Sequence, residues 1–446
     1  MSERSGLLTG WGGTSGSRGQ LRQVSADEVA AVLSRAGERG VIARGLGRSY
    51  GDPAQNAGGE VLAPLPGAIA EPAEDGTVEV SAGTSLHELM RFLLPRSRFL
   101  PVTPGTRYVT VGGALACDVH GKGHHRSGSF GDHVASFDLV LPDASLRTVT
   151  PDDGDLFWAT VGGMGLTGIL TSARLRTVAV ESGYISATTQ RLPDIDSLLA
   201  EMASSDDEFA YSVAWIDTEA GGRALGRSVL SRGDHATRAQ LTGRAATEPL
   251  IVPGEPRLAV PFVPPVGLVT RATSRAFNEL WFRKAPRFRS GEIQSIGAFF
   301  HPLDGVAHWN RLYGPHGVVQ YQLVLPEDRD DVLRSLLAQL AGDRHPTFLA
   351  VLKRFGPGNQ GWLSFPTAGW TLAVDLPVRP GLARLLDRFD EVVAAAGGRV
   401  YLAKDARLRP ELLDAMYPAA ARFRALRSDL DPHRRLQSDL GRRLAL

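Results

Sequence analysis

The sequence predicts an α+β protein with two domains and a C-terminal segment that returns to the first of them. At 446 residues the chain is too long for one compact core. Short strands, glycine-rich loops and helical stretches alternate up to about residue 180, and longer strand-like runs interleaved with amphipathic helices follow. We therefore expect domains at 1–183 and 184–398, with residues 399–446 packing back on the first domain.

Capping boxes and alternation indicate the elements of the first domain. Twice a serine is followed three residues later by a glutamate, a pattern that marks the start of a helix. Runs in which apolar and polar residues alternate indicate strands. In chain order, these patterns predict a helix at 25–40, strands at 41–43 and 77–83, a helix at 85–94, a helical stretch at 156–163 and a strand at 169–180.

The second domain has the pattern of an antiparallel sheet with helices beside it. We predict strands at 211–216, 318–325 and 370–378, helices at 330–342 and 382–398, and a terminal helix within 423–446. The apolar segment 258–269, "LAVPFVPPVGLV", is interrupted by prolines that suit neither a helix nor a central strand. It is either a lid or docking surface for an apolar ligand, or a buried irregular connection.

The composition is that of an ordinary globular protein, with 43% apolar and 22% charged residues. A net charge of +1 provides no overall field for nucleic acid, and the single cysteine excludes an internal disulfide. The first 24 residues contain no apolar targeting segment, and no run of apolar residues is long enough to span a membrane. From the sequence alone we expect a cytoplasmic protein that does not bind nucleic acid.

The stretch 110–134, "TVGGALACDVHGKGHHRSGSFGDHV", concentrates four of the eleven histidines beside the only cysteine. Three imidazoles can hold a zinc ion. Lys122, however, would place a cation between the first two candidate ligands, and the surrounding glycines provide no helix face to fix ligand geometry. We therefore expect no metal, and interpret the stretch as the wall of a cofactor pocket or catalytic site.

Glycine-rich loops are the second candidate feature. Residues 163–168, "GMGLTG", have the spacing of a dinucleotide fingerprint, but a helical stretch precedes them and a strand follows, which is the reverse of what a Rossmann site needs. Successive backbone N–H groups in such loops can surround a diphosphate, although any one loop could be only a tight turn. The candidate segments are 43–52, 104–121 and 159–169.

In this order and spacing the three segments resemble the FAD-binding domain of the vanillyl-alcohol-oxidase type, or PCMH-type, flavoproteins. Motifs from both domains are similar, over nearly the whole chain, to the decaprenylphosphoryl-β-D-ribose 2′-oxidases of actinobacterial cell-wall synthesis. They include "ARGLGRSYGD", "PGTRYVTVGGALACDVHGKGHH", "FHPLDGVAHWNRLYGP", "YLAKDAR" and "DPHRRLQSDLGRRL". The resemblance implies a two-domain PCMH-type FAD-binding fold with an antiparallel-sheet substrate domain.

The same resemblance implies an FAD-dependent oxidoreductase that converts the 2′-hydroxyl of a polyprenyl-phosphoryl-β-D-ribose to the 2′-keto sugar. This is the first half of the epimerisation that makes the arabinose donor for cell-wall arabinan, and a separate NADH-dependent keto-reductase would complete it. A polyprenyl-phosphate-linked pentose as substrate further implies peripheral membrane contact or a periplasmic location. Two alternatives stay open: an oxidase of a soluble sugar, alditol or nucleoside in secondary metabolism, and a non-catalytic scaffold subunit.

Arg48 stands where some members of the superfamily attach FAD covalently through a histidine, so non-covalent FAD is expected. His124 and His125 are expected either to support the residues that face the flavin or to be structural. The cofactor-binding residues that the resemblance implies are Ala43, Arg44, Gly45, Leu46, Gly47, Arg48, Ser49, Tyr50, Gly51, Gly105, Thr110, Val111, Gly112, Gly113, Cys117, Asp118, Val119, His120, Ile169 and Tyr401.

Only four of the 49 basic residues are lysines, and three of them fall in segments that the family places around the substrate. A chain that otherwise uses arginine keeps a lysine where a compact, tunable ammonium is needed. The catalytic residues implied are Lys404, which would hold the reacting hydroxyl, with His120, Tyr50 and Gln322. The substrate-binding residues implied are Lys122, Tyr313, Gln320, Lys353, Arg354 and Ala373, with Lys353 and Arg354 at the phosphate. The sequence does not identify the base that takes the hydroxyl proton.

At Ala373 the mycobacterial members of the family carry a cysteine beside the flavin. Nitroaromatic inhibitors capture that cysteine after the enzyme reduces their nitro group to a nitroso group. The resemblance therefore implies that this chain keeps the activity but lacks the thiol that these inhibitors need.

Overall fold

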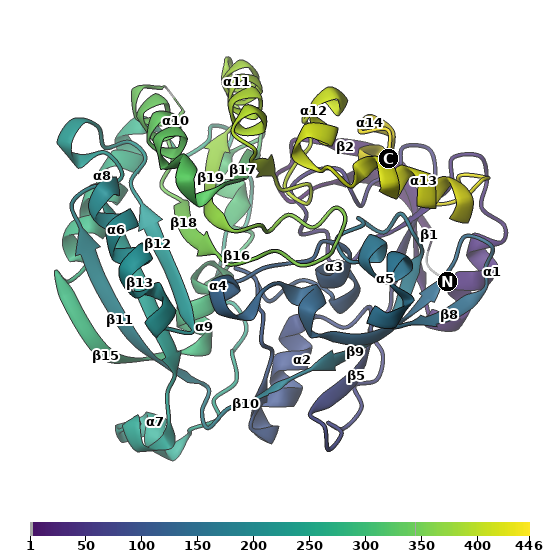
Figure 1. Cartoon of the computed structure of the whole chain (residues 1–446), viewed down its shortest axis with the longest axis horizontal. Coiled ribbons are helices and arrows are strands. Elements are labelled where there is room, and N and C mark those ends of the chain that lie inside the picture. Colours follow the sequence, from purple (N-terminus) through teal and green to yellow (C-terminus); the bar gives the residue numbers. More distant parts are fainter. Residues whose placement is uncertain (1–2, 344) are drawn as a thin grey trace.

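The computed structural model describes residues 3–343 and 345–446, which form two parts lying side by side (Figure 1). One part holds two four-stranded sheets with short helices, and the other holds one eight-stranded sheet. Helices and antiparallel strands are mixed in both parts. The predicted α+β class is therefore confirmed.

The first part is built on two small sheets. In one, β2 (Gly16–Val24), β4 (Glu60–Pro64) and β3 (Val41–Ala43) run parallel, and β1 (Glu3–Thr9) pairs antiparallel with β2. The other is antiparallel, in the order β5 (Thr77–Ser81), β9 (Ile169–Arg176), β7 (Val134–Val140), β8 (Leu146–Val149). A two-stranded ribbon joins β6 (Arg98–Phe99) to β10 (Val178–Ala179). The strands predicted in this region are confirmed.

The helices of the first part are α1 (Val29–Leu33), α2 (Leu86–Leu93), α3 (Val111–Ala116), α4 (His124–Ser127) and α5 (Asp155–Thr160). Both predicted capping boxes form, because Ser25 and Ser85 each donate from their backbone N–H and hydroxyl to the glutamate three residues later. The helix predicted at 25–40 is nevertheless shorter. It ends at Leu33, ahead of Gly37 and Gly40, and Gly40 adopts a φ of +65° that continues no helix.

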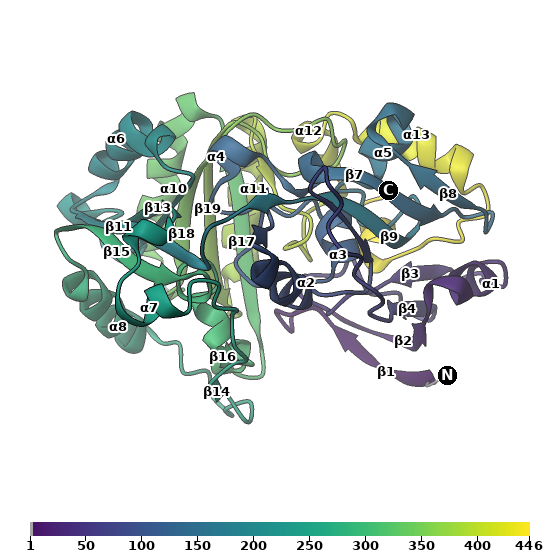
Figure 2. The same cartoon turned by 90° about the horizontal axis from the view of Figure 1, so that it is seen from below.

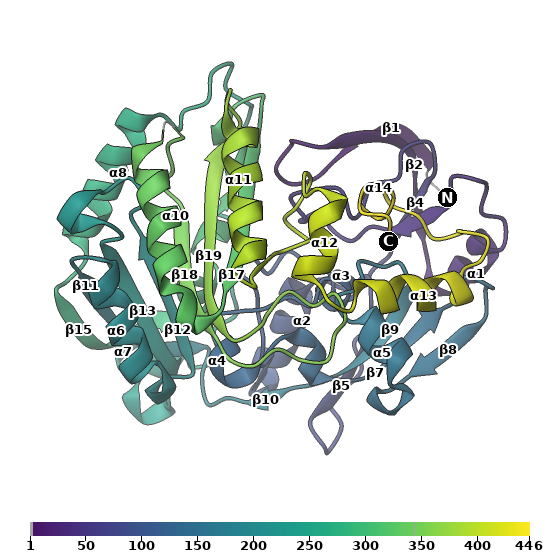
Figure 3. The same ribbon diagram turned by 45° about the horizontal axis from the view of Figure 1, so that its top comes forward.

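The second part is a single antiparallel sheet. Its order is β15 (Phe288–Ser295), β11 (Tyr184–Leu192), β13 (Ser228–His235), β12 (Tyr211–Ile216), β18 (Ala350–Phe355), β19 (Gly369–Pro377), β17 (Val318–Leu325), β20 (Arg399–Val400). Three helices, α6 (Ile195–Ser205), α10 (Asp330–Gly342) and α11 (Leu382–Ala395), pack on one face through their leucines, and Figure 3 shows α10 and α11 over it. The predicted strands and helices here are confirmed. The other face is turned toward the first part.

The C-terminal tail returns to the first part as three short helices: α12 (Pro410–Met416), α13 (Ala420–Leu430) and α14 (Asp439–Arg443) (Figure 1). Leu436 forms a bridge with Val41, and Arg443 pairs with Asp52 at 2.8 Å. The single terminal helix predicted within 423–446 is wrong. The chain leaves the helix at Asp431, whose carboxylate accepts the backbone N–H groups of the two residues 435 and 436 instead.

Two irregular segments, 258–269 and 302–316, lie against each other at one end of the large sheet. Their short strands β14 (Leu258–Ala259) and β16 (Val306–Ala307) pair in parallel, and Figure 2 shows this pair projecting from the body. Five large apolar side chains of 258–268 are exposed, so the segment is not a buried connection. The remaining helices are α7 (Gly243–Thr247), α8 (Arg271–Lys284) and α9 (Ile296–Phe300). No helix in the described ranges is long and apolar enough to cross a membrane.

Candidate active site

The first glycine-rich loop, residues 43–52, follows β3 and presents unpaired backbone donors. Within the described part of the chain, the backbone N–H groups of residues 45–49 have no hydrogen-bond partner. The Arg44 guanidinium braces the loop by donating to the carbonyls of Thr9 and Ala54 at 2.7 and 3.0 Å. Five successive free N–H groups form a concavity that suits a diphosphate.

The second glycine-rich segment forms the N-terminus of α3 rather than a turn. Thr110 caps this helix, because its hydroxyl accepts the N–H of Gly113 at 3.1 Å. A Cβ at Gly45 would lie 2.3 Å from the Thr110 hydroxyl, so the first two segments touch. A Cβ at Gly105 would meet nothing within 4 Å. The two segments thus form one glycine-lined surface that a ligand can approach closely.

The third segment, 159–169, lies behind α3. The N–H groups of Gly162 and Met164 donate to the carbonyls of Leu115 and Ala116 at the end of that helix. Ile169, at the start of β9, is fully buried. The expectation that this segment also offers backbone donors to the ligand is therefore wrong for Gly162 and Met164, because α3 uses their N–H groups.

Asp118, just after α3, uses its carboxylate inside the protein. It accepts the hydroxyls of Ser129 and Ser364, the N–H of Gly131 at 2.8 Å and the amide of Asn359 at 2.9 Å. The side chain thus ties α3 to the segment 359–364 and is not free to bind a ligand. Only its backbone remains for the cofactor contact that the resemblance implies.

His120 lies where the two parts meet. Its ring is 4.9, 5.4 and 5.1 Å from the ring centroids of Phe355, Phe365 and Tyr401. Burial, together with the charge of Lys353, holds the pKa of His120 well below its ordinary value, so the imidazole is neutral. Its Nε2 lies 2.8 Å from the Gln322 amide nitrogen and accepts from it, which leaves the proton on Nδ1. Nδ1 is buried without a partner among the described residues and is free to donate to a ligand.

Three of the four lysines, Lys122, Lys353 and Lys404, are half-buried near this histidine, and the structure brings them together as the resemblance suggested. Burial lowers the pKa of Lys122 and of Lys353 to about 7, and the charges of Lys404 and Lys122 lower that of Lys353 further. Lys404 Nζ lies 4.4 Å from the ring centroid of Tyr50, whereas Lys122 donates to the carbonyl of Phe299. Within the described residues no carboxylate offsets the charge of Lys122 or Lys353, so the cluster favours an anionic ligand.

Asp375 on β19 is a buried carboxylate of this site that our sequence analysis missed. Its Oδ1 accepts from the Gln320 amide at 2.5 Å, and the same amide donates to the Tyr50 hydroxyl at 3.2 Å. Its Oδ2 is buried without a partner in the described ranges. Burial raises the pKa of Asp375, and the nearby charge of Lys404 lowers it. Burial lowers the pKa of Lys404, and the charge of Asp375 raises it. The sequence did contain a signal for it: Asp375 is the lone charged residue in the apolar strand 370–378. It stands two residues from Ala373 and therefore points to the same face of the strand.

The register of the large sheet places these polar side chains on one face. Across β17 and β19, Gln320 is opposite Asp375 and Gln322 is opposite Ala373. Lys353 on β18 is opposite Thr371, which lies on the same face of β19. Directly opposed residues of antiparallel strands point to the same side. Glutamines, lysine and aspartate therefore form one polar wall facing His120.

Arg354 does not belong to this wall. Successive side chains of a strand point to opposite faces, so Arg354 is directed away from Lys353. It pairs instead with Glu327 at 2.7 Å and with Asp207 at 3.4 Å. The expectation that Lys353 and Arg354 contact one phosphate is therefore wrong for Arg354.

A cavity of about 380 Å³ lies beside Lys404, Tyr50 and Gln320. The segment 302–316 covers the site, and its Tyr313 is buried in a cluster with Tyr50. The Tyr313 hydroxyl has no partner among the described residues. Burial and the neighbouring Asp375 raise its pKa, so it is a neutral phenol that can donate to a bound molecule.

Of the remaining histidines of the stretch 110–134, His125 and His133 bond to the backbone, whereas the ring of His124 packs 4.4 Å from that of Phe355 and neither of its nitrogens has a partner among the described residues. His125 Nε2 lies 3.1 and 2.9 Å from the carbonyls of Asp206 and Phe209, and His133 Nε2 lies 2.7 Å from that of Ser127. Among the residues that the structure describes, no three histidine, cysteine or carboxylate side chains are arranged to hold a metal ion.

Comparison with known proteins places this site in a family. The model of an FAD binding domain family matches residues 21–150. A decaprenylphosphoryl-β-D-ribose oxidase of Mycolicibacterium smegmatis is 42% identical over 98% of this chain and 97% of its own length. The chain belongs to the decaprenylphosphoryl-β-D-ribose oxidase family. It is therefore an FAD-dependent oxidoreductase with the PCMH-type fold that the sequence predicted.

Two further relatives of this oxidase come from Streptomyces. An uncharacterised Streptomyces coelicolor protein is 43% identical over 81% of this chain and the whole of its own length. An alditol oxidase of a Streptomyces species is 26% identical over 95% of both chains. The fold thus also serves an oxidase named for a soluble substrate, which makes the substrate a question for the site.

The site of this oxidase fits FAD. The free N–H groups of 45–49 suit its diphosphate, and the glycine-lined surface at Gly45 and Thr110 leaves room for close approach. Tyr401 donates to the carbonyl of Cys117 at 2.8 Å and thereby links the substrate sheet to the end of α3. The aromatic and polar side chains around His120 lie where the two parts meet. These are the residues that we infer hold the cofactor.

We expect the FAD of this oxidase to be non-covalent. The resemblance places Arg48 where other members attach the flavin through a histidine, and an arginine cannot form that bond; its guanidinium carbon is 3.9 Å from the Trp11 ring centroid. Acid or heat should therefore release all of the flavin into the supernatant, where its absorbance can be measured. Yellow colour that stays with the precipitated protein would contradict this.

Replacing Ala373 by cysteine should create an inhibitor target without changing turnover. Ala373 is buried on the polar wall opposite Gln322. Burial raises the pKa of the native Cys117 thiol to about 11, so it holds almost no reactive thiolate. After turnover with a nitroaromatic inhibitor, intact-mass spectrometry should show no adduct on the wild type and one on the Ala373→Cys variant. An adduct on Cys117 would mean that this thiol is accessible and our account of the pocket is wrong.

Proposed function

We propose that this oxidase converts the 2′-hydroxyl of a polyprenyl-phosphoryl-β-D-ribose to the 2′-ketone. The observation that supports this best is the half-buried cluster of Lys122, Lys353 and Lys404 beside one carboxylate. A neutral alditol offers no charge to offset Lys122 and Lys353, which no carboxylate of the described residues faces, whereas the phosphodiester of the lipid-linked sugar does. The 42% identity to an oxidase named for decaprenylphosphoryl-ribose supports the same substrate class.

The reaction removes a hydride from the carbon and a proton from its hydroxyl. FAD, when bound, supplies the acceptor for the hydride. Lys404, held over the Tyr50 ring, is placed to donate to the reacting hydroxyl oxygen and hold it in position. Asp375 takes the proton through Oδ2, because this oxygen is buried and unpaired while Gln320 fixes Oδ1. His120 and Gln322, hydrogen-bonded to each other, orient a neighbouring sugar hydroxyl.

The phosphate is assigned to the other two lysines. Lys353 projects from the same face of the sheet as Thr371, and Lys122 is close enough for its charge to lower the pKa of Lys353. A bound phosphodiester anion would raise the pKa of both ammonium groups again and favour their charged form. Tyr313 and Gln320 are assigned to the sugar from the covering side.

The product chemistry implies a partner. A 2′-keto sugar still attached to its polyprenyl phosphate becomes the arabinose epimer when hydride is returned to the opposite face. This oxidase therefore supplies the keto-sugar substrate of a separate NADH-dependent keto-reductase. The two reactions together form the arabinose donor for cell-wall arabinan. The lipid-linked substrate also calls for contact with a membrane surface.

Anaerobic flavin bleaching tests the proposed function. Ribosyl phosphates with and without a prenyl chain, a free pentose and an alditol are mixed with the oxidase, and the loss of flavin absorbance is followed. Bleaching by the prenyl-phosphoryl ribose, with little bleaching by free pentose or alditol, is the expected result. Equal bleaching by an alditol would favour the soluble-substrate oxidase, and a protein that binds no flavin would favour a scaffold.

A further inference from the structure

Nine large apolar side chains are exposed along one stretch of chain, residues 258–288. They are 40 to 73% exposed and make up nine of the fifteen exposed large apolar residues in the described part of the chain. We call them the docking face. Its members are Leu258, Phe262, Val263, Val266, Leu268, Phe277, Leu280, Trp281 and Phe288. An exposed apolar concentration of this kind marks an interaction surface.

Basic residues are interspersed along the chain with those of the docking face, although Arg275 and Arg289 pair with Glu219 and Glu292. The stretch 257–291 holds seven arginines and lysines and one acidic residue, whereas the whole chain has a net charge of +1, so the rest of the molecule is acidic. The one acidic residue, Glu279, is paired with Arg227 and Arg283. Apolar side chains beside basic ones suit an anionic bilayer. The apolar side chains insert among the lipid tails, and the basic side chains bind the anionic headgroups.

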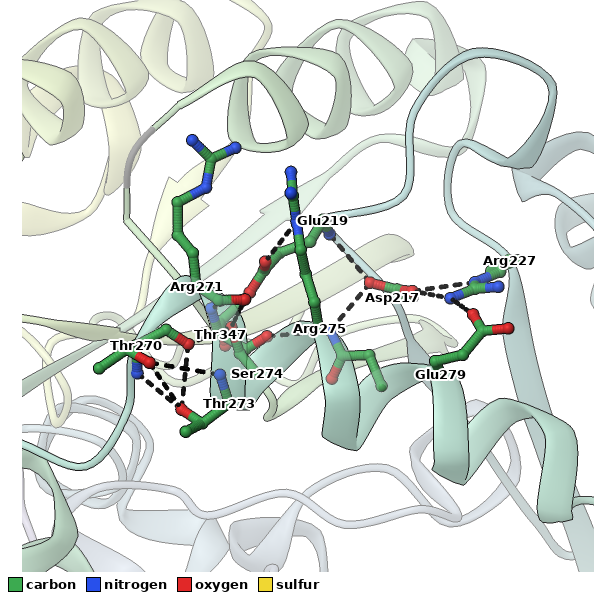
Figure 4. A network of polar contacts seen from close by, with 11 residues as sticks. Asp217, Glu219, Arg227, Thr270, Arg271, Thr273, Ser274, Arg275, Glu279 and Thr347 are labelled. Atoms are coloured by element: carbon green, nitrogen blue, oxygen red, sulfur yellow. Dashed lines mark hydrogen bonds and ion pairs between the residues drawn. The ribbon is translucent and has the colours of Figure 1, made fainter.

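The exposure of α8 is built into the fold. Asn278 donates to Asp217 at 2.9 Å and to the carbonyl of Thr347 at 3.1 Å. Arg227 links Asp217 to Glu279 at 2.8 and 2.7 Å, and Figure 4 shows this network along the helix. These contacts fix which side of α8 faces the sheet. The helix therefore cannot turn to bury Leu280, which stays 68% exposed.

A row of aromatic rings joins the docking face to the candidate active site. Trp281 and Phe277 stack at 5.9 Å, Phe277 meets Phe348 at 5.3 Å, and Phe348 stacks on Tyr313 at 6.0 Å. Tyr313 is the buried residue of the cover that clusters with Tyr50. The row thus runs from solvent to the edge of the site and offers an apolar path to a long hydrocarbon chain.

We propose that the docking face seats this oxidase on an anionic lipid bilayer and that the aromatic row leads the prenyl chain from the bilayer to the site. The first half of this proposal depends only on the surface. The second half rests on the proposed function, because only a lipid-linked substrate needs such a path. The test is therefore arranged so that the two can fail separately.

Vesicle flotation of the FAD-loaded full-length oxidase tests the docking face. We expect binding to phosphatidylcholine vesicles that contain phosphatidylglycerol to be about tenfold or more tighter than to phosphatidylcholine alone, and to weaken as salt is raised. The double variant Phe262→Asp, Val266→Asp should lose at least about tenfold in binding. Leu146→Asp is the matched control, because Leu146 is 65% exposed on β8, far along the chain from the face, and should bind as the wild type does.

Three results would overturn the docking face: no preference of the wild type for anionic vesicles, equal loss in the Leu146 control, or a concentration-dependent dimer in solution that the double variant abolishes.

For the substrate path, the double variant should reduce its flavin normally with a soluble short-chain ribosyl phosphate but at least about tenfold more slowly with a long-chain substrate in vesicles. Equal rates of flavin reduction with the two substrates would show that the aromatic row does not lead the prenyl chain to the site. A wild type that floats but is bleached by no ribosyl phosphate would leave the docking face standing and overturn the proposed function.

Discussion

Replacing Lys404 by methionine should leave FAD bound and slow flavin reduction by about a hundredfold or more, the scale of losing one positioned group at the reacting atom. The ammonium lies over the Tyr50 ring and lines the cavity, and within the described residues it makes no hydrogen bond that holds the free N–H groups of 45–49, which we assign to the diphosphate. Methionine keeps the length and apolar stem of the side chain but cannot donate to the sugar hydroxyl. Stopped-flow reduction with a ribosyl phosphate, at matched flavin content, measures the effect.

Replacement of Lys404 by arginine should fail as well. A planar guanidinium is wider than an ammonium and cannot stand at the same point over the ring. Arg388→Met is the control, because Arg388 is an exposed cation on α11 whose loss should leave the reduction rate unchanged. A Lys404→Arg variant with full activity would show that any cation suffices there, and our assignment of Lys404 to the hydroxyl would be wrong.

Sequence patterns predict the large sheet well because its strands and helices follow simple periodicities. The helix at 330–342 and the strand at 318–325 have the bounds that apolar spacing predicts. The shortened first helix and the broken tail differ, because local groups decide them: the N–H groups of Arg35 and Ala36 turn to the carbonyls three residues before them, and the Asp431 carboxylate takes over backbone donors. Such local competition leaves no periodic trace in a sequence.

The candidate site could be predicted in part. The scarcity of lysine, together with the segments that the family resemblance places around the substrate, pointed to Lys122, Lys353 and Lys404, and the structure places all three in one half-buried cluster. Asp375 escaped because its importance depends on cross-strand partners, Gln320 above all, that only the register of the sheet reveals. Arg354 was misplaced for the converse reason: adjacency in sequence suggested a shared role, whereas strand alternation separates neighbours.

Replacing Asp375 by asparagine should abolish the acid limb of the pH profile and lower kcat/KM by about a hundredfold or more, as expected for a lost general base. The carboxylate is the reactive form, and burial raises its pKa above the ordinary value. Activity of the wild type should therefore fall as the pH drops through that raised pKa, at a higher pH than an exposed aspartate would show. Asparagine keeps the shape and accepts from Gln320 but takes no proton.

The alkaline limb separates this role from a structural one. Asp375 raises the pKa of Lys404, so removing its charge should move the loss of the Lys404 ammonium, and with it the alkaline limb, to lower pH. Asp431→Asn is the matched control: this carboxylate is also buried, but it accepts the backbone N–H groups of Arg435 and Leu436 in the C-terminal tail, outside the polar wall and the cavity. That variant should lower the unfolding temperature and leave both limbs in place. If Asp375→Asn kept the acid limb of the wild type, the proton would go to another group, and the Lys404 amine and the Asp405 carboxylate, which both line the cavity, would be the candidates.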